Sequence, residues 1–226
     1  MGSGGAKDRL MGARRDLYRE AILDAAERIF AELGYEATKV ADITSEAGVS
    51  LATFYAVFKK KWDVYRAVHA RRLAELMETI GSPRLDGDDV LDAMMRGVET
   101  YLTFHMQYPH YLRMHLREGN AWTSDAGLRS PEQAEAWQAG IAMTMTGFEA
   151  GIAQGIFLAD DTELMARTML GMHQVRLALW VERGQQGDAA ELSREALKQL
   201  IRSFCPHDRI EELLSVAGLV DERASA

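Results

Sequence analysis

The sequence predicts an all-α protein with an N-terminal three-helix domain, which contains a helix-turn-helix, and a C-terminal helical bundle. Apolar residues recur with helical spacing along the chain, and no stretch alternates convincingly with period two. A run of Gly, Ser, Pro, Asp and Gly at 81–87 interrupts this pattern and marks the domain boundary. With 226 residues and only four prolines, the chain is long enough for one or two domains with a hydrophobic core.

The first helix is expected from about Arg14 to Leu33. Gly34 ends it, because a glycine readily adopts the left-handed conformation that follows a helix. Met1–Gly5 look like an expression-tag remnant, so residues 1–15 are assigned to this remnant and an N-terminal arm. The apolar residues of the helix form one stripe with i, i+3, i+4 spacing: Ile22, Ala25, Ala26, Ile29, Phe30 and Leu33.

Two short helices follow, at about 40–47 and 51–57. Gly48 terminates the first of them, and Ser50 caps the N-terminus of the second. A fourth helix is expected at 61–80. This pattern of two short helices joined by a tight turn predicts a helix-turn-helix over about residues 39–58. The second helix of such a motif enters the DNA major groove.

Beyond the break the chain again shows helical periodicity, with a loop at 119–130. The segment 139–159 is long enough to span a membrane, but its Thr and Gln residues and Glu149 favour a helix buried in a bundle. Glycines in this segment are expected to permit close approach of another helix. The helices are expected at about 87–107, 109–118, 131–157, 161–184, 188–204 and 207–216.

The helix at 51–57 has the pattern of a recognition helix. Phe54, Val57 and Phe58 can pack inward, and the lysines at 59–61 offer cations to phosphates. The alternative is a compact three-helix core followed by a solvated lysine run. Side chains that can then contact phosphates or bases point outward: Leu51, Ala52, Thr53 and Tyr55.

Charge is distributed unevenly along the chain. Residues 1–78 hold 13 Lys and Arg against 12 Asp and Glu, a net charge of +1. Residues 79–226 hold 13 against 22, a net charge of −9, and the two parts sum to −8. Contact with a polyanion such as DNA is therefore expected in the first third.

Residues 22–68 resemble the N-terminal domain of the TetR family of bacterial transcriptional regulators. The matching residues read I-x2-AA-x2-IF-AELGYEAT, V-x-DI-x3-AGVS, TFY, F-x2-K and AV. The resemblance implies a DNA-binding domain at 16–76 and an effector-binding and dimerisation domain at 77–226. Together with Ser50 and Lys59, the DNA-binding positions that it implies are Lys39, Val40, Ala41, Leu51, Ala52, Thr53, Tyr55, Val57 and Lys61.

Three departures from the family pattern concern this surface, and one of them, Ala52 in place of a glycine, is a small change. Lys39 stands where the family has Thr or Ser, and a lysine cannot accept hydrogen bonds from helix N–H groups. That cap is therefore lost or shifted to Thr38. Trp62 replaces an acidic residue and is expected to pack against a phosphate-sugar edge or the domain interface.

The second domain is rich in methionine and aromatic residues, which suit either a bundle core or an adaptable pocket. The resemblance favours a pocket for a small apolar or aromatic effector. Arg176 can meet a ligand carboxylate or form a salt bridge to Glu149 or Glu182. The candidate effector-binding residues are Tyr101, Phe104, His105, Tyr111, Met143, Met169, His173 and Arg176.

No catalytic residues, metal ligands or cofactors are predicted. The six histidines lack metal-ligand spacing, and no nucleophile, base and acid stand in a recognisable pattern. An enzyme on a helical bundle and an architectural DNA binder without an effector are the alternatives. The single cysteine, Cys205, fits a reducing cytoplasm and is expected to be an idle or buried thiol.

Helices 161–184 and 188–204 carry apolar seams that suit a two-fold homodimer interface, unless both seams face their own core. The resemblance completes the expected function. The chain is interpreted as a cytoplasmic, ligand-responsive regulator without a membrane segment. It is expected to be a repressor that a small effector releases from a palindromic DNA operator.

Overall fold

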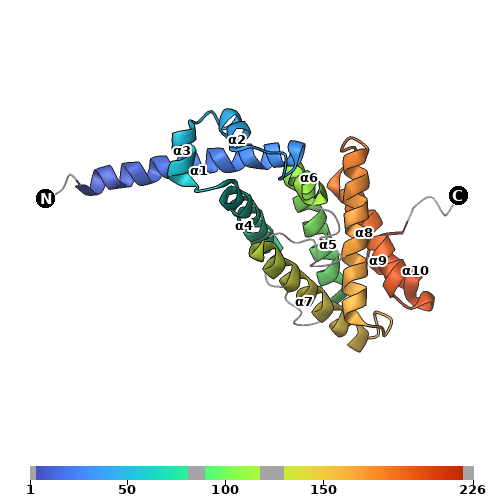
Figure 1. The fold of residues 1–226 in the computed structure, drawn as a ribbon. Coiled ribbons are helices and arrows are strands. Elements are labelled where there is room, and N and C mark those ends of the chain that lie inside the picture. Colours follow the sequence, from blue (N-terminus) through green and yellow to red (C-terminus); the bar gives the residue numbers. More distant parts are fainter. Residues whose placement is uncertain (1–3, 81–89, 118–129, 221–226) are drawn as a thin grey trace. The chain divides into compact units, whose positions relative to one another are not determined.

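The computed structural model describes residues 4–80, 90–117 and 130–220, and every regular element in these ranges is a helix (Figure 1). The prediction of an all-α protein is confirmed. The chain forms two compact units. The first unit contains residues 1–74 and 110–119, and the second contains residues 75–109 and 120–226. The break predicted at 81–87 lies outside the described residues.

In the first unit, α1 packs against α2 and α3, which also contact each other. Phe30, Phe54 and Tyr65 are among the largest fully buried side chains of the chain and fill this core. The helices of this unit are α1 (Gly4–Leu33), α2 (Val40–Glu46), α3 (Leu51–Val57), α4 (Lys61–Ile80) as far as Ala74, and α6 (Pro109–Arg117) from His110.

The helix α1 begins at Gly4, well before the start expected near Arg14. The extra turns contain Ala, Lys, Arg, Leu and Met, which are good helix formers. Their side chains are exposed from Arg9 to Leu17, so burial does not explain the helix. The apolar stripe identified only the part of α1 that packs.

In the second unit, α5 contacts α7, α8 and α9, while α8 also lies against α7 and α9, and α10 packs on α9. Of the loop predicted at 119–130, only Ser130 is described, and its hydroxyl caps α7 by accepting a hydrogen bond from the Gln133 N–H at 3.3 Å. The elements of this unit are α5 (Val90–Gln107), α7 (Pro131–Ala153), α8 (Thr162–Glu182), α9 (Ala189–Phe204), the 3-10 turn His207–Arg209 and α10 (Ile210–Val216).

The helix α7 ends at Ala153, four residues before the end expected at 157. Gly155 adopts a φ of +68° and turns the chain away. Of the other glycines, Gly147 lies against Met94 of α5, as expected for a close approach, whereas Gly151 makes room for the Phe157 ring. Within the described residues, none of the helices combines the length and the apolarity that a membrane crossing requires.

Candidate functional site

A tight turn joins α2 to α3. Gly48 has a φ of +64°, which favours glycine, and the Val49 N–H donates to the Thr44 carbonyl at 3.0 Å. Ser50 then caps α3, because its hydroxyl accepts a hydrogen bond from the Thr53 N–H at 3.0 Å. The chain therefore forms a helix-turn-helix at the predicted position, with α3 as the second helix.

The two faces of α3 differ in burial. Phe54 and Phe58 are buried, as expected for its rear face, whereas Val57 is half-buried and so fits neither an inward nor an outward position fully. Leu51 is 51% exposed and Tyr55 is 55% exposed. Such large, exposed side chains on a short helix leave an apolar contact surface and a phenol hydroxyl available to a ligand. The predicted outward residues Ala52 and Ser50 are exposed, and Thr53 and Val40 are half-buried.

Lys39 precedes α2, and its side chain is exposed, as is that of Ala41. The Lys39 backbone N–H donates to the Asp42 carboxylate at 2.7 Å, which stabilises the start of the helix. The cap has not shifted to Thr38, because the Thr38 hydroxyl donates to the Gly34 carbonyl at 2.7 Å. The Lys39 ammonium therefore remains at the surface beside α2.

Lys61 behaves differently from the two lysines before it. Its ammonium donates to the carbonyl oxygens of Tyr35 at 2.6 Å and Thr38 at 2.7 Å, and lies 4.3 Å from the centre of the Tyr35 ring. Lys61 thus fastens the loop between α1 and α2, and the phosphate contact predicted for it stays a prediction. Lys59 and Lys60 are exposed.

Trp62 belongs to an aromatic cluster that the sequence did not reveal. Its ring stacks on Tyr65, with centres 5.3 Å apart and planes 15° apart, and meets Tyr35 edge-on at 5.8 Å. These contacts lie inside the first unit. The indole therefore helps to hold α4 against the loop after α1.

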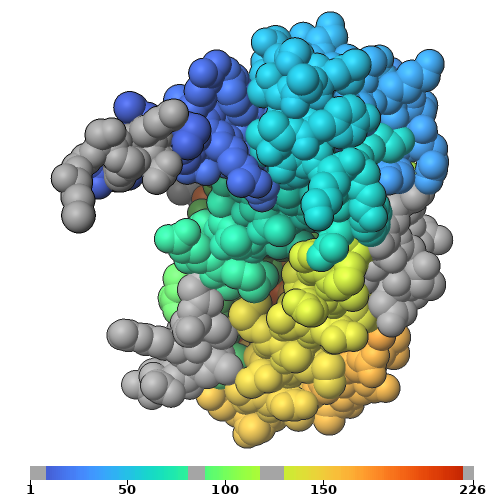
Figure 2. Space-filling model, turned by 60° about the vertical axis from the view of Figure 1, so that its left-hand side comes forward, coloured from blue at the N-terminus to red at the C-terminus, as the bar shows by residue number. Residues whose placement is uncertain are grey.

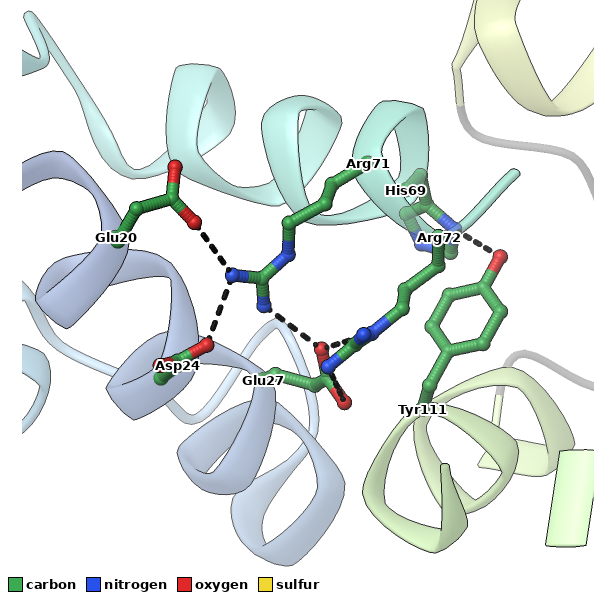
Figure 3. Close-up of polar contacts among 7 residues, drawn as sticks. All are labelled: Glu20, Asp24, Glu27, His69, Arg71, Arg72 and Tyr111. Atoms are coloured by element: carbon green, nitrogen blue, oxygen red, sulfur yellow. Dashed lines mark hydrogen bonds and ion pairs between the residues drawn. The ribbon is translucent and has the colours of Figure 1, made fainter. Parts of the chain in front are cut away.

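Ion pairs connect α4 to α1 (Figure 3). Arg71 lies 3.1 Å from Glu20, 2.8 Å from Asp24 and 3.1 Å from Glu27, and Arg72 lies 2.8 Å from Glu27. Burial alone would lower the pKa of Arg71, but the hydrogen bonds that its guanidinium donates to the Asp24 and Glu20 carboxylates raise it. Glu27 is only 5% exposed, so its ion pairs join the second half of α1 to α4 largely out of water.

Comparisons with known proteins relate residues 22–68 to a family of regulators. Residues 22–68 match the family described as "Bacterial regulatory proteins, tetR family". Over 50 residues the chain is 44% identical to the HTH-type transcriptional repressor ComR of Escherichia coli (strain K12), which covers 22% of this chain and 24% of ComR. Over residues 22–68 the chain is thus similar to the TetR family.

Two further proteins are similar to the chain over different extents. The Fatty acid metabolism regulator protein of Bacillus subtilis (strain 168) is 34% identical over 68 residues, which cover 30% of this chain and 34% of that protein. The matches to ComR and to this regulator therefore span about a quarter and about a third of their lengths. A tetR-family protein from Rhodococcus RHA1 shares the fold over 83% of this chain and 97% of its own, with a TM-score of 0.70 and 20% identity. The family description and both names are those of regulators, in agreement with the prediction that the chain is not an enzyme.

The TetR-type helix-turn-helix lies in the first unit, and so does one residue predicted to bind the effector. Tyr111 of α6 is buried, and its hydroxyl lies 3.3 Å from Nδ1 of the buried His69 on α4 (Figure 3). The prediction grouped Tyr111 with residues of α5, α7 and α8, which belong to the second unit.

In the second unit the structure brings together Tyr101 and His105 of α5 with His173 of α8. Ring centres lie 4.4 Å apart for Tyr101 and His105, and 6.0 Å apart for Tyr101 and His173. Burial lowers the pKa of both histidines to about 4, although the Tyr101 carbonyl, 2.9 Å from His105 Nδ1, opposes the change for His105. Phe104 and Met169 are buried on the same helices, and Met143 of α7 is half-buried.

His173 is 2% exposed, and neither of its ring nitrogens has a hydrogen-bond partner within the described parts of the chain. A buried polar atom without a partner costs about 1–3 kcal/mol, so this ring is suited to receive a polar group from a ligand. Arg176 is one turn further along α8. It donates to the Glu195 carbonyl at 3.0 Å and to the Gln199 side chain, rather than to Glu149 or Glu182.

Two other predictions concern Cys205 and metal binding. Cys205 is buried, and burial raises the pKa of its thiol to about 11, which suits an idle thiol. Across the ranges that the structure covers, no three His, Cys, Asp or Glu side chains are grouped as metal ligands.

The helices proposed for dimerisation expose different surfaces. On α8, Val175 is 60% exposed and Leu179 is 39% exposed, while Met172, three residues before Val175, is half-buried. On α9, Leu200 and Ile201 are fully buried within the chain. The apolar stripe of α9 therefore serves its own core, and only α8 leaves an apolar row at the surface.

Proposed function

We propose that this chain is a DNA-binding regulator of transcription that responds to a small molecule. The helix-turn-helix carries the proposal: α3 is capped by Ser50, anchored by Phe54, and exposes Leu51 and Tyr55. Such a surface suits apolar contact with base edges and hydrogen bonding to phosphates. The exposed Lys39, Lys59 and Lys60 add cations.

A homodimer would present two copies of α3 to a palindromic operator. Half-sites of such an operator lie about 34–36 Å apart, one turn of DNA. The exposed apolar row of α8 is the surface that we assign to this dimer, because Val175 and Leu179 are exposed apolar residues one turn apart on the same helix. From α9 we expect only its solvent-facing residues to take part.

For the effector we propose a small apolar or aromatic molecule with a neutral polar group. The second unit supplies the aromatic ring of Tyr101 beside His105 and His173. Both histidines are neutral near pH 7, so they suit a hydroxyl or carbonyl group. The Bacillus subtilis relative is named as a regulator of fatty acid metabolism, and a fatty acid is also a largely apolar molecule with a polar end.

We further propose that the chain is a repressor that the effector releases from DNA. A ligand shifts an equilibrium only if it binds the two states with different affinities. The helix α4 carries residues of both units, since the division falls after Ala74. A change in the second unit therefore has a continuous helix through which to alter the separation of the two recognition helices.

The test begins with wild-type protein and a random pool of double-stranded DNA, from which bound duplexes are selected. On the selected duplex, Tyr55→Ala should weaken binding about tenfold, as expected for the loss of one good contact. Arg202→Gln, at an exposed position of α9, is the control and should bind like wild type. A wild-type protein that enriches no duplex would refute the proposed function.

A second experiment tests the effector. Apolar and aromatic compounds are screened by thermal shift with and without the selected duplex. A true effector should stabilise the free protein and lower its affinity for the duplex, and a reporter gene should be derepressed. A compound that stabilises both forms equally would count against release.

A further inference from the structure

A basic row lies on α1 outside the residues assigned to the helix-turn-helix. Arg15 and Arg19 are four residues apart and therefore share one face of the helix. Ile22 and Ala26, which continue this row by three and seven residues beyond Arg19, are fully buried where α1 packs against α2 and α3. The face of α1 that meets those helices thus continues past the core as a basic surface.

Arg19 lies directly beside the recognition helix. Its guanidinium is 4.9 Å from the centre of the Phe58 ring, and Phe58 is the C-terminal cap of α3. The exposed Lys59 and Lys60 follow Phe58 in the chain. The basic row of α1 therefore begins next to the end of α3 that carries the exposed lysines.

Nearby acidic groups do not cancel this row completely. Glu20 and Asp24 are engaged by Arg71, at 3.1 and 2.8 Å. Asp16 is exposed and lies between the two arginines in sequence. Arg15 is also exposed.

The exposed turns of α1 also lack packing. Leu10 is 72% exposed and Leu17 is 73% exposed, and in Figure 2 the blue start of α1 projects beyond the cyan residues of α2 and α3. A helical segment that packs against nothing is only marginally stable in water. A binding partner that packed against these turns would stabilise this part of the helix.

We propose that the N-terminal part of α1 is a second DNA-contacting element, in which Arg15 and Arg19 bind backbone phosphates beside the bases that α3 reads. The proposal rests on the proposed function, because it needs a DNA operator. A guanidinium suits this task, since its planar set of donors can bind a phosphate through two hydrogen bonds. The helix rises about 1.5 Å per residue, so the two arginines are about 6 Å apart along α1, close to the spacing of successive phosphates on a strand.

The experiment compares Arg15→Gln, Arg15→Lys and the double variant Arg15→Gln/Arg19→Gln on the duplex selected by the wild-type protein. Fluorescence anisotropy measures affinity at several salt concentrations. Arg183→Gln/Arg202→Gln is the control, because it removes the same charge from exposed positions of the second unit. Arg15→Gln is the cleaner variant, since Arg19 also contacts Phe58.

Each lost phosphate contact should flatten the log–log salt dependence by about 0.9 per subunit, and thus by about 1.8 per dimer for Arg15→Gln. Affinity at about 0.1 M salt should fall roughly tenfold or more for that variant. Arg15→Lys should keep the salt slope, because a phosphate contact needs the charge. Hydrogen exchange at residues 9–19 should also slow when wild-type protein binds the duplex.

The proposal is overturned if Arg15→Gln and the double variant bind with the wild-type slope while Tyr55→Ala loses affinity. In that case the helix-turn-helix binds DNA without help from α1, and the proposed function stands. The proposal is also overturned if the arginine variants change only the oligomeric state. In that case the exposed start of α1, with Leu10 and Leu17, would be a protein contact. If the wild-type protein binds no duplex, both proposals fail.

Discussion

Lys61 shows how a cation in a basic run can serve the fold instead of a ligand. Three lysines follow α3 in sequence, and neither their spacing nor the family resemblance shows that the last of them binds backbone carbonyl groups. In the structure its ammonium satisfies the carbonyl groups of Tyr35 and Thr38, which no helix hydrogen bond would otherwise use. Only the path of the loop between α1 and α2 brings those carbonyls to α4, so sequence spacing could not reveal the contact.

Lys61→Met should therefore destabilise the protein by about 2 kcal/mol, because hydrogen bonds to a charged group are worth roughly 1.5–3 kcal/mol. The methionine keeps most of the apolar stem. Urea unfolding measures the change, with Lys60→Met at an exposed position as control, where a change within about 0.5 kcal/mol is expected. If Lys61→Met leaves stability unchanged but flattens the salt dependence of DNA binding, the phosphate role is correct instead.

His105 and His173 make stability depend on pH. Their folded-state pKa of about 4 lies below the ordinary value of 6.5, so the unfolded chain binds more protons between these two values. Stability should then rise with pH from about 4 to 6.5 and be lost as pH falls through that window. Each histidine should contribute roughly 1.4 kcal/mol per pH unit, and Arg176 and the other histidine add repulsion at His173.

His173→Phe should show a shallower loss of stability than wild type between pH 6.5 and about 4, because one of the two titrating groups is gone. The measurement is urea unfolding at several pH values. His207→Phe, at an exposed position, serves as control and should keep the wild-type dependence. Identical pH dependence in wild type and His173→Phe would show that His173 is hydrated in solution.

At the scale of elements, sequence and structure agree where the chain carries strong end signals. The bounds of α3 and α4 match the prediction, because Gly48 and Ser50 mark the turn and the cap. They disagree at the start of α1, which has no such signal, and at the end of α7, where helical periodicity runs on to Gly155. The predicted helix ends are wrong where the apolar periodicity does not begin or stop at the same residue as the helix.

The candidate sites were predictable to different degrees. The surface of α3 follows from local signals, and the exposed Leu51 and Tyr55 lie as predicted. Tyr111 belongs to the first unit and His105 to the second, so their common role in effector binding stays a prediction. Contacts between distant helices decide which residues share a site, and these contacts cannot be predicted from composition or residue spacing.

The ion cluster between α1 and α4 yields a prediction at this scale. Glu27→Gln should destabilise the first unit by roughly 3 kcal/mol, because it leaves Arg71 and Arg72 partly buried without their shared partner. Glu46→Gln is the matched control, since the Arg28–Glu46 pair joins α1 to α2 at the surface and should contribute less than about 1 kcal/mol. Chemical denaturation of both variants compares the two losses, and equal losses would show that burial of the cluster is unimportant.

For the whole molecule, the exposed row of α8 and the buried stripe of α9 predict opposite outcomes for charge insertion. Val175→Glu should yield a monomer that folds normally but binds the operator weakly, because Val175 is 60% exposed in the chain. Leu200→Glu should instead prevent folding, because Leu200 is fully buried. Light scattering and thermal unfolding distinguish the two, and a wild-type monomer at micromolar concentration would contradict the dimer.

The division of the chain into units also has a consequence for synthesis. The first unit takes residues 1–74 and 110–119, so α5 of the second unit is made before the first unit is complete. Until α6 emerges, the position beside His69 that Tyr111 later fills stays open, and the apolar side of α5, with Val98 and Leu102, has no α7, α8 or α9 to cover it. The nascent chain thus passes through a stage in which neither unit can close, and the order of folding is tied to the arrival of α6 rather than to the end of α4.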